Sequence, residues 1–338
     1  MDKDQVFDLM NSGSLPGSQN QAEMKETHIS WIILTDHYAF KIKRPVKYSF
    51  LDFSSLEKRR HYCHEELKLN QRLAPDMYLT VLPVTGNMLN KTRSGEKSTI
   101  IDYAVQMKRM DNKKEMDNML KTDKVSDKHI IKLAEKIARF HQSANVIKNK
   151  FDTAGFQEKY KDIKSVIPNL KKKSMIRMIS VIEQGIDKSK SFLTDREDFL
   201  NNRIKKGFHR DCHGDLNSRN IFVYEDPVIF DCIEFNKEYR HIDVLNDIAF
   251  LCVDLDYFGK SNFSELFYKK YLEYTDFKDN ADTRQLFTYY KSYRANVRAK
   301  VTLISASKTE DDKKNKALVN DAVKYLELMK KYTDLTGC

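Results

Sequence analysis

Two short and largely apolar runs, each with one or two polar residues, lie near the start of the chain and predict a β-hairpin. The runs are ISWIIL and YAFKIK, both rich in aromatic and β-branched residues, and TDH separates them. Residues 54–74 then predict a helix with Ser54 or Ser55 at its N-cap and Glu57 placed for a capping box. YLTVLPVTG and TIIDYAVQMKRM predict two further strands, so the order is that of a small α+β lobe.

The pattern then changes to the period of a helix. In residues 126–144, SDKHIIKLAEKIARFHQSA, apolar positions recur every three or four residues. Residues 151–206 predict more helices, and so does everything from about residue 242 onward. We therefore expect an α+β chain with a small sheet lobe at residues 1–108 and a larger, mainly helical lobe at residues 109–338.

Composition narrows the class of protein. Of the 338 residues, 41% are apolar and 32% are charged, with only 10 glycines and 6 prolines, which favours an ordered, helix-rich fold. The longest apolar run, IAFLCV, is far too short to cross a membrane. The first residues, MDKDQVFDLM, do not resemble a signal peptide, and five scattered cysteines indicate free thiols in a reducing compartment. We expect a cytoplasmic protein without a membrane partner.

The net charge of +10 favours partners such as nucleic acid or phosphorylated small molecules. Most of the positive charges are dispersed lysines with many acids between them, so a lysine-rich solvated surface explains the balance equally well.

The strongest chemical signal is the stretch HGDLNSRNIFVYEDPVIFD, residues 213–231. IFVY and VIF flank EDP, a turn signal, and a hairpin there brings Asn220 and Asp231 to the same end. Two neighbouring oxygen ligands suit Mg²⁺, which also binds phosphates. Asp215 lies five residues before Asn220 and can face the same site without ligating the metal. This is the layout of metal-assisted phosphoryl transfer.

The same stretch resembles the catalytic loop of the aminoglycoside phosphotransferase and protein-kinase-like superfamily. The small-molecule branch of that superfamily reads H-G-D-x-x-x-x-N, followed by a hairpin and a metal-binding Asp. ETHISWIIL, YAFKIKRPV, FDCIEFN and RHIDVLNDIAFLCVDLD more narrowly resemble a bacterial and archaeal group of aminoglycoside-phosphotransferase-like proteins, over about residues 26–305. The resemblance implies a protein-kinase-like bilobal fold, with ATP and Mg²⁺ as cofactors.

The resemblance assigns roles in the second half of the chain. Asp215 corresponds to the catalytic base, and Asn220 and Asp231 to the magnesium ligands. HRD also occurs, at 209–211, but the residue five positions after Asp211 is Leu216, which cannot ligate a metal. Spacing therefore selects Asp215.

In the first half, Lys41 of AFK corresponds to the strand lysine that pairs with the nucleotide phosphates. Its acidic partner should lie on the next helix, where Glu65 and Glu66 compete. Glu66 is preferred because it lies near the buried stripe of that helix. Lys43 is expected to be a solvated neighbour.

The nucleotide base is expected to meet backbone groups near Met107 and Arg109, after the last strand of the small lobe. Two features depart from the superfamily pattern. THIS, ending at Ser30, stands where a glycine-rich loop would cover the phosphates. Asn217 stands where many relatives carry His, so it is a candidate for the acceptor site.

Residues 283–309 contain no acid, and Lys291, Arg294 and Arg298 share one face of the predicted helix. Such a stripe is either solvated or a phosphate or carboxylate clamp, and we take Arg294 and Arg298 as acceptor-site candidates. Among nearby residues, His141, Cys212 and Asp247 are expected to be structural.

The sequence thus predicts an ATP- and Mg²⁺-dependent phosphotransferase that moves the γ-phosphate to a hydroxyl of a small molecule. Aminoglycosides are polycations, and the net charge of +10 with an acid-free helix fits them poorly, so a neutral or anionic acceptor is expected. The alternatives are a nucleotide-gated RNA-binding protein, or a kinase that acts on RNA or protein.

Overall fold

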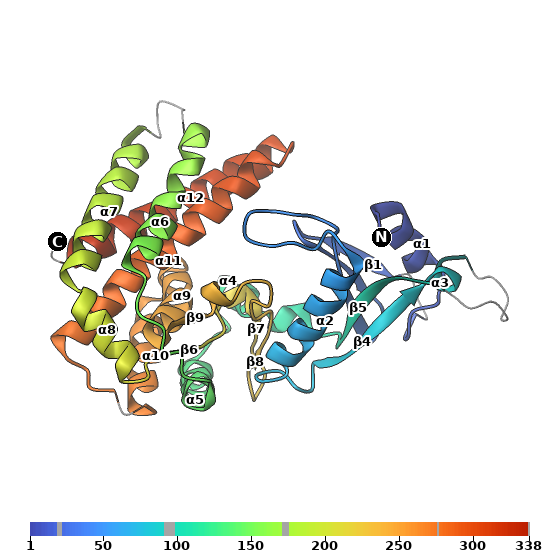
Figure 1. Cartoon of the computed structure of the whole chain (residues 1–338), viewed down its shortest axis with the longest axis horizontal. Coiled ribbons are helices and arrows are strands. Elements are labelled where there is room, and N and C mark those ends of the chain that lie inside the picture. The colour runs from blue at the N-terminus through green and yellow to red at the C-terminus, as the bar shows by residue number, and fades with distance from the viewer. Residues whose placement is uncertain (19–21, 91–98, 171–175, 276, 337–338) are drawn as a thin grey trace. The chain divides into compact units, whose positions relative to one another are not determined.

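In the computed structural model, the two apolar runs near the start of the chain form the predicted hairpin, β2 (Ser30–Leu34) and β3 (Tyr38–Lys43). The other two predicted strands are β4 (Tyr78–Thr85) and β5 (Ile100–Lys108), and all of these pairings are antiparallel. A further strand, β1 (Glu23–Glu26), extends the sheet to the order β1-β2-β3-β5-β4 (Figure 1). Its sequence, EMKE, is polar and mostly exposed, so it offers no apolar alternation from which to predict a strand.

The chain divides into two compact units, which we call the sheet unit and the helical unit. The sheet unit comprises Met1–Met119 and Arg219–Tyr239. The helical unit comprises Leu120–Ser218 and Arg240–Cys338. The structure describes residues 1–18, 22–90, 99–170, 176–275 and 277–336.

Both faces of the sheet are covered, and β3 contributes to both because its successive side chains point to opposite sides. Phe40 packs in a core cluster to which α1 (Lys3–Asn11) contributes. Ala39 packs in a second core cluster to which α2 (Leu56–Asn70) contributes. By the same alternation, Lys41 lies on the α2 face of the sheet.

The start of α2 resolves an alternative that the sequence left open. Ser55 is the N-cap, and its side chain accepts a hydrogen bond from the N–H of Lys58 at 3.3 Å. Lys58 therefore occupies the third helical position. The expected capping box with Glu57 is wrong, because it required the helix to start one residue earlier.

The hairpin predicted around EDP is also present, as β7 (Ile221–Phe222) and β8 (Val228–Ile229). Ile221 lies opposite Ile229 in the antiparallel register. The sequence prediction had placed this hairpin in the lobe that begins at residue 109. In the structure it belongs to the sheet unit, because its apolar side chains, Phe222 among them, pack into the α2-side core cluster.

The helical unit confirms the helical prediction for the second half of the chain. Its helices are α5 (Asp127–Ser143), α6 (Thr153–Lys161), η2 (Asp162–Leu170), α7 (Ile176–Asp195), α8 (Glu197–Lys205), α9 (Val244–Tyr257), α10 (Ser261–Glu273), α11 (Ala281–Ser307) and α12 (Asp312–Leu335). Side chains from α7, α11 and α12 share one apolar core cluster. Two three-residue strands, β6 (His209–Asp211) and β9 (His241–Asp243), pair in this unit and were not predicted.

The remaining short elements connect the larger ones. They are α3 (Gly86–Asn90), η1 (Asn112–Lys114), α4 (Met116–Lys121), η4 (Ser218–Asn220) and η5 (Lys237–Tyr239). Of the helices in the described ranges, none combines the length and the apolar character that a membrane span requires. Four cysteines are buried and free, namely Cys63, Cys212, Cys232 and Cys252. Cys338 lies outside the described residues.

Candidate active site

Lys41 lies at the centre of the site in the sheet unit. Its Nζ is 2.8 Å from Oε1 of Glu66 on α2 and 2.6 Å from Oδ1 of Asp231. Burial alone would lower the pKa of Lys41, but the carboxylates of Asp231 and Glu66 raise it well above its usual value. Glu65, the reserve candidate, is partly exposed. The structure thus brings together three residues that the sequence placed in one site.

The backbone around Asp231 is held by hydrogen bonds from three successive N–H groups. Phe230 donates to the carbonyl of Asn220 at 3.0 Å, Asp231 to the hydroxyl of Tyr78 at 3.3 Å, and Cys232 to Oδ1 of Asn70 at 2.8 Å. Asp231 has φ of +63°, a left-handed conformation that is unfavourable for a residue with a side chain. These bonds explain how the chain keeps that conformation while the side chain stays 42% exposed.

Asn220 and Asp231 fit a hard divalent cation. The hairpin register and the bond between the Asn220 carbonyl and Phe230 put both residues at the same end of the hairpin. An amide oxygen and a carboxylate oxygen are donors that Mg²⁺ prefers. Asp231 already faces one cation, the ammonium of Lys41, and retains exposed carboxylate surface.

In the helical unit, the segment His213–Ser218, which we call the 213–218 loop, carries Asp215. Asp247 of α9 accepts hydrogen bonds from the N–H of His213 at 3.1 Å and from the N–H of Gly214 at 2.8 Å. Gly214 has φ of +86°, where a side chain would be strained. Asp215 is partly exposed, whereas its neighbours in the loop are buried. The loop therefore presents the carboxylate of Asp215.

Asn217, an acceptor-site candidate, is buried and lies next to Asp215 in the structure. Its side-chain amide donates to the carbonyl of Asp215 at 3.1 Å, and its N–H donates to the same oxygen at 2.9 Å. These bonds shape the turn that follows Asp215.

A second acid of α9 holds the far end of the 213–218 loop. Asp254 accepts from the N–H of Ser218 at 3.1 Å and from its hydroxyl at 2.8 Å. Nε of Arg298 lies 3.2 Å from Asp254. Arg294 donates to the carbonyl of Gly214 at 3.1 Å. Acids on α9 and the guanidinium group of Arg294 thus contact the same loop, and Arg298 pairs with one of those acids.

These contacts correct the interpretation of the basic stripe on α11. The alternative that it is a solvated face is wrong, because Lys291, Arg294 and Arg298 are all largely buried. Lys291 pairs with Asp256 at 2.5 Å. The acids that neutralise the stripe lie on α9, so it does not form the unpaired positive surface from which an anionic acceptor was inferred. Arg294 contacts the loop that carries Asp215, and Arg298 pairs with Asp254, which holds that loop. Any contact of either residue with an acceptor remains a prediction.

Three other sequence predictions concern the nucleotide. Ser30 is fully buried opposite Lys43 in the sheet, and its hydroxyl has no hydrogen-bond partner among the described residues. In this conformation it cannot contact a phosphate. Met107 lies within β5, and the N–H of Arg109 already donates to the carbonyl of His37 at 2.8 Å. That amide is therefore not available to a nucleotide base.

Lys43 was expected to be solvated, and this expectation is wrong. Its side chain is almost completely buried, its Nζ lies 2.8 Å from Oε2 of Glu66, and it also pairs with Glu234. Burial would lower its pKa, but the two carboxylates raise it. Glu66 consequently lies between two ammonium groups, which hold its pKa at about 2 although burial acts in the opposite direction. The sequence contained a signal that Lys43 lies on the same face of the sheet as Lys41, because the two residues are two positions apart on one strand.

Asp211, which spacing rejected as the base, has a different environment. It lies in β6, is mostly buried, and pairs with Nε of Arg240 at 3.2 Å. The pair links the strand before the 213–218 loop to the residue that precedes β9.

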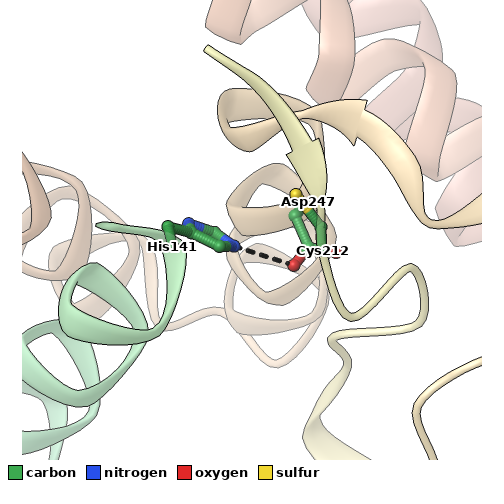
Figure 2. A group of neighbouring side chains, drawn as sticks. All are labelled: His141, Cys212 and Asp247. Atoms are coloured by element: carbon green, nitrogen blue, oxygen red, sulfur yellow. Dashed lines mark hydrogen bonds and ion pairs between the residues drawn. The ribbon is translucent and has the colours of Figure 1, made fainter. Parts of the chain in front are cut away.

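Figure 2 shows a cluster of His141, Cys212 and Asp247 behind the same loop. Nε2 of His141 lies 3.1 Å from Asp247, and its Nδ1 lies 2.8 Å from the hydroxyl of Tyr271. Both ring nitrogens therefore have protein partners, and Asp247 is shared with the loop backbone. We interpret the cluster as support for the loop, as the sequence indicated.

Comparisons with known proteins show the fold. No family model matches the chain. Uncharacterized proteins of Mycobacterium tuberculosis and Mycobacterium bovis are 30% identical to it over 314 residues. That alignment covers 90% of this chain and 58% of each relative, so the chain spans less than two thirds of the length of these curated relatives.

Three solved structures illustrate the likeness. The GDP and kanamycin complex of APH(2″)-IIia has a TM-score of 0.58 at 11% identity, covering 98% of this chain and 99% of that chain. An amicoumacin kinase with AMP-PNP, Ca²⁺ and Ami has a TM-score of 0.57 at 14% identity, and the match covers 97% of this chain and 94% of that chain. A choline kinase from Cryptosporidium parvum has a TM-score of 0.53 at 12% identity, and the match covers 98% of this chain and 97% of that chain. The predicted bilobal fold of aminoglycoside phosphotransferases and protein-kinase-like proteins is confirmed.

Proposed function

We propose that this chain is a phosphotransferase that moves the γ-phosphate of a nucleoside triphosphate to a hydroxyl group of a small molecule. The observation that carries the proposal is the position of Lys41, which contacts Glu66 and Asp231 at the same time. An ammonium group between a helix carboxylate and a half-exposed acid is what nucleotide phosphates and their metal require. Solved structures of the same fold include complexes with GDP and with AMP-PNP.

In this proposal, Lys41 binds the phosphates, and Asn220 and Asp231 hold Mg²⁺. The metal would neutralise the charge of the phosphate oxygens when it is bound. Glu66 keeps the ammonium of Lys41 in place, because the two groups are in contact and Glu66 is fully buried. Burial of this pair favours one orientation of the lysine over the many that an exposed side chain would adopt.

Asp215 is the proposed base. The acceptor oxygen forms a bond to the γ-phosphorus while the bond from that phosphorus to the bridging oxygen breaks, and the hydroxyl proton passes to the carboxylate of Asp215. The nucleoside diphosphate leaves. Two features of this chain support the role: Asp215 is partly exposed in an otherwise buried loop, and Asp247 fixes the backbone just before it.

The base of the nucleotide is proposed to meet the backbone at Met110. The N–H groups of Lys108 and Arg109 donate to the carbonyls of Met77 and His37, both at 2.8 Å. The next N–H along the chain is that of Met110, for which the described residues provide no hydrogen-bond acceptor. The contact therefore moves one residue beyond the position expected from sequence.

The proposed acceptor is a small hydroxyl compound, neutral or anionic. The net charge of +10 supports this acceptor class. The guanidinium groups of α11 add no support, because they are already paired or hydrogen-bonded within the protein. Phosphorylation of a panel of sugars, sugar acids, nucleosides, a short RNA and an aminoglycoside would identify the class. Efficient transfer to the aminoglycoside alone would contradict the acceptor class but leave the reaction intact.

Substitution of the two acids tests the reaction itself. Asp215→Asn should lower the rate of transfer by about 100-fold to 10,000-fold, the range that general acid–base catalysis supplies, while nucleotide binding is retained. Asp231→Asn should weaken Mg²⁺-dependent nucleotide binding as well as transfer. Asp211→Asn is the matched control, because it removes a nearby carboxylate that pairs with Arg240. Equal rate losses at Asp211 and Asp215 would refute the assignment of the base.

A further inference from the structure

A closed set of alternating charges lies on the α2 face of the sheet unit, and only part of it has a role in the proposed reaction. Lys41 contacts Oε1 of Glu66, and Lys43 contacts Oε2 of the same carboxylate, both at 2.8 Å. Lys41 also contacts Asp231, and Lys43 also contacts Glu234. We call these five residues the charge ring, since the backbone from Asp231 to Glu234 closes it.

The half of the ring formed by Lys43 and Glu234 is deeply buried. Both side chains are at most 4% exposed, and the ammonium of Lys43 also lies 4.8 Å from the centre of the Phe53 ring. A buried charge needs an interaction that offsets its loss of hydration, and Lys43 and Glu234 provide that interaction for each other. Neither side chain is exposed enough to contact a nucleotide.

The ring contains three carboxylates and two ammonium groups, which leaves one negative charge when all five are ionised. That charge is not shared equally among the acids. Glu66 and Glu234 are buried, whereas the side chain of Asp231 is 42% exposed. The exposed end of the ring is therefore the place where a cation from solvent can bind.

We propose that Lys43 and Glu234 are positioning residues that fix Asp231 for the metal of the bound nucleotide. Hydrogen bonds from the N–H groups of Phe230, Asp231 and Cys232 fix the first part of the segment. The ion pair at Glu234 fixes its other end, three residues after Asp231. With both ends held, the left-handed backbone of Asp231 at φ of +63° is maintained and its carboxylate keeps one direction.

Sharing of Glu66 gives Lys43 a second effect. If Lys43 were absent, Glu234 would lose its contacting cation and Glu66 would keep only Lys41, so Lys41 would be the cation nearest to both acids. Lys41 would then be drawn away from Asp231 and from the phosphates. Mutation of residues that orient a metal ligand in this indirect way typically lowers metal affinity by about 10-fold to 100-fold.

The alternative is that the Lys43–Glu234 pair only stabilises the fold. A purely stabilising buried pair can be replaced by two apolar residues with little loss, whereas removal of one partner is strongly destabilising. The double variant Lys43→Met/Glu234→Met separates the two explanations. Its midpoint of urea unfolding and its dissociation constant for ADP are measured with Mg²⁺ and with a chelator in place of Mg²⁺.

We expect the double variant to be more stable than either single variant and to bind ADP about as well as the wild type when the chelator is present. With Mg²⁺, its dissociation constant for ADP should rise by about 10-fold to 100-fold, the range seen for residues that orient metal ligands. A double variant that binds ADP with Mg²⁺ as tightly as the wild type would overturn the proposal.

Glu234→Asp keeps the test decisive if the double variant does not fold. It retains the charge and shortens the side chain by one methylene, so the fold should survive while the end of the segment moves. Weaker binding of ADP with Mg²⁺ but not with the chelator supports the proposal, and unchanged binding overturns it.

The inference rests on the proposed function through the role of Asp231. A wild-type chain that binds no nucleotide would refute the proposed function, whereas equal binding by wild type and variants would refute the positioning role alone.

Discussion

The two units hold their proposed reactive groups by different kinds of contact. In the sheet unit, charged side chains fix one another: Lys41 is held by Glu66 and Asp231. In the helical unit, carboxylates on α9 fix the backbone of the loop: Asp247 and Asp254 accept from N–H groups at its two ends. The first arrangement depends on the charge of every member, whereas the second depends mainly on acids outside the loop and on backbone N–H groups within it.

This difference predicts how substitutions behave. Within the charge ring, each side chain contacts one or two oppositely charged side chains, so removal of one member changes the environment of the others. The stability losses of single substitutions in the ring should therefore not be additive. In the 213–218 loop, the hydrogen bonds to Asp247 and Asp254 come from His213, Gly214 and Ser218 and not from the side chain of Asp215. Substitution of Asp215 leaves these bonds in place, so it should change chemistry more than stability.

The largest loss of stability is expected at the centre of the charge ring. Glu66→Gln would leave two buried ammonium groups without their shared carboxylate, and breaking a buried ion pair in this way costs on the order of 3 kcal/mol or more. Glu65→Gln is the matched control, one position away and partly exposed, where a change within about 0.5 kcal/mol is expected. Urea unfolding measures both. Similar losses at the two positions would contradict the ring as a source of stability.

A smaller and pH-dependent loss is expected at Asp247. The carboxyl is fully buried, which would raise its pKa, but hydrogen bonding to His141 and nearby positive charge lower the pKa to about 2. Because the folded pKa lies below that of the unfolded chain, the carboxylate stabilises the fold above the unfolded pKa, and this contribution disappears as pH falls toward 2.

Asp247→Asn should therefore lose about 2 kcal/mol at neutral pH, and the difference from the wild type should shrink as the pH falls below about 4. Urea unfolding at several pH values measures the difference. Asp195→Asn, at an exposed position, is the control and should show no such trend. A difference that stays constant down to the lowest pH at which the wild type folds would contradict the role of the ionised carboxylate.

Local patterns in the sequence were sufficient for the elements and for part of the site. Runs rich in aromatic and β-branched residues predicted β2 and β3, and the runs IFVY and VIF on either side of the EDP turn predicted the second hairpin and its joined ends. The buried stripe of α2 selected Glu66 over Glu65. Each of these predictions uses residues within one element or one turn of chain, where geometry follows directly from period.

The sequence could not reveal pairings between distant segments. Lys43 is buried because Glu234 reaches it from a segment 191 residues away, and no local pattern contains that information. The stripe on α11 was predicted to be either a solvated face or an anion clamp because its own segment lacks acids, yet Asp254 and Asp256 of α9 pair with two of its members. β6 and β9 are only three residues each, which is too short for alternation to be recognised.

Arg298 offers a prediction of intermediate size. It donates from Nε and Nη2 to the hydroxyl of Tyr325, at 3.2 and 3.0 Å, and also pairs with Asp254. Lysine retains the charge but cannot supply two directed donors, so Arg298→Lys should cost about 1 kcal/mol. Because Asp254 also holds Ser218, the rate of transfer should fall too. Lys300→Arg, in a solvent-exposed pair with Asp162, is the control and should change neither quantity measurably.

The smallest effect is expected at the start of α2, and it separates helix stability from the position of Glu66. Ser55→Ala removes the acceptor of the Lys58 N–H and should destabilise the fold by about 0.5 to 1 kcal/mol. Glu66 lies eleven residues further along and is held by two lysines, so binding of nucleotide should be unchanged. Ser54→Ala, which removes an exposed hydrogen bond from the Ser54 hydroxyl to Oδ1 of Asp52, is the matched control. Weaker nucleotide binding by Ser55→Ala would mean that α2, more than the charge ring, determines where Glu66 lies.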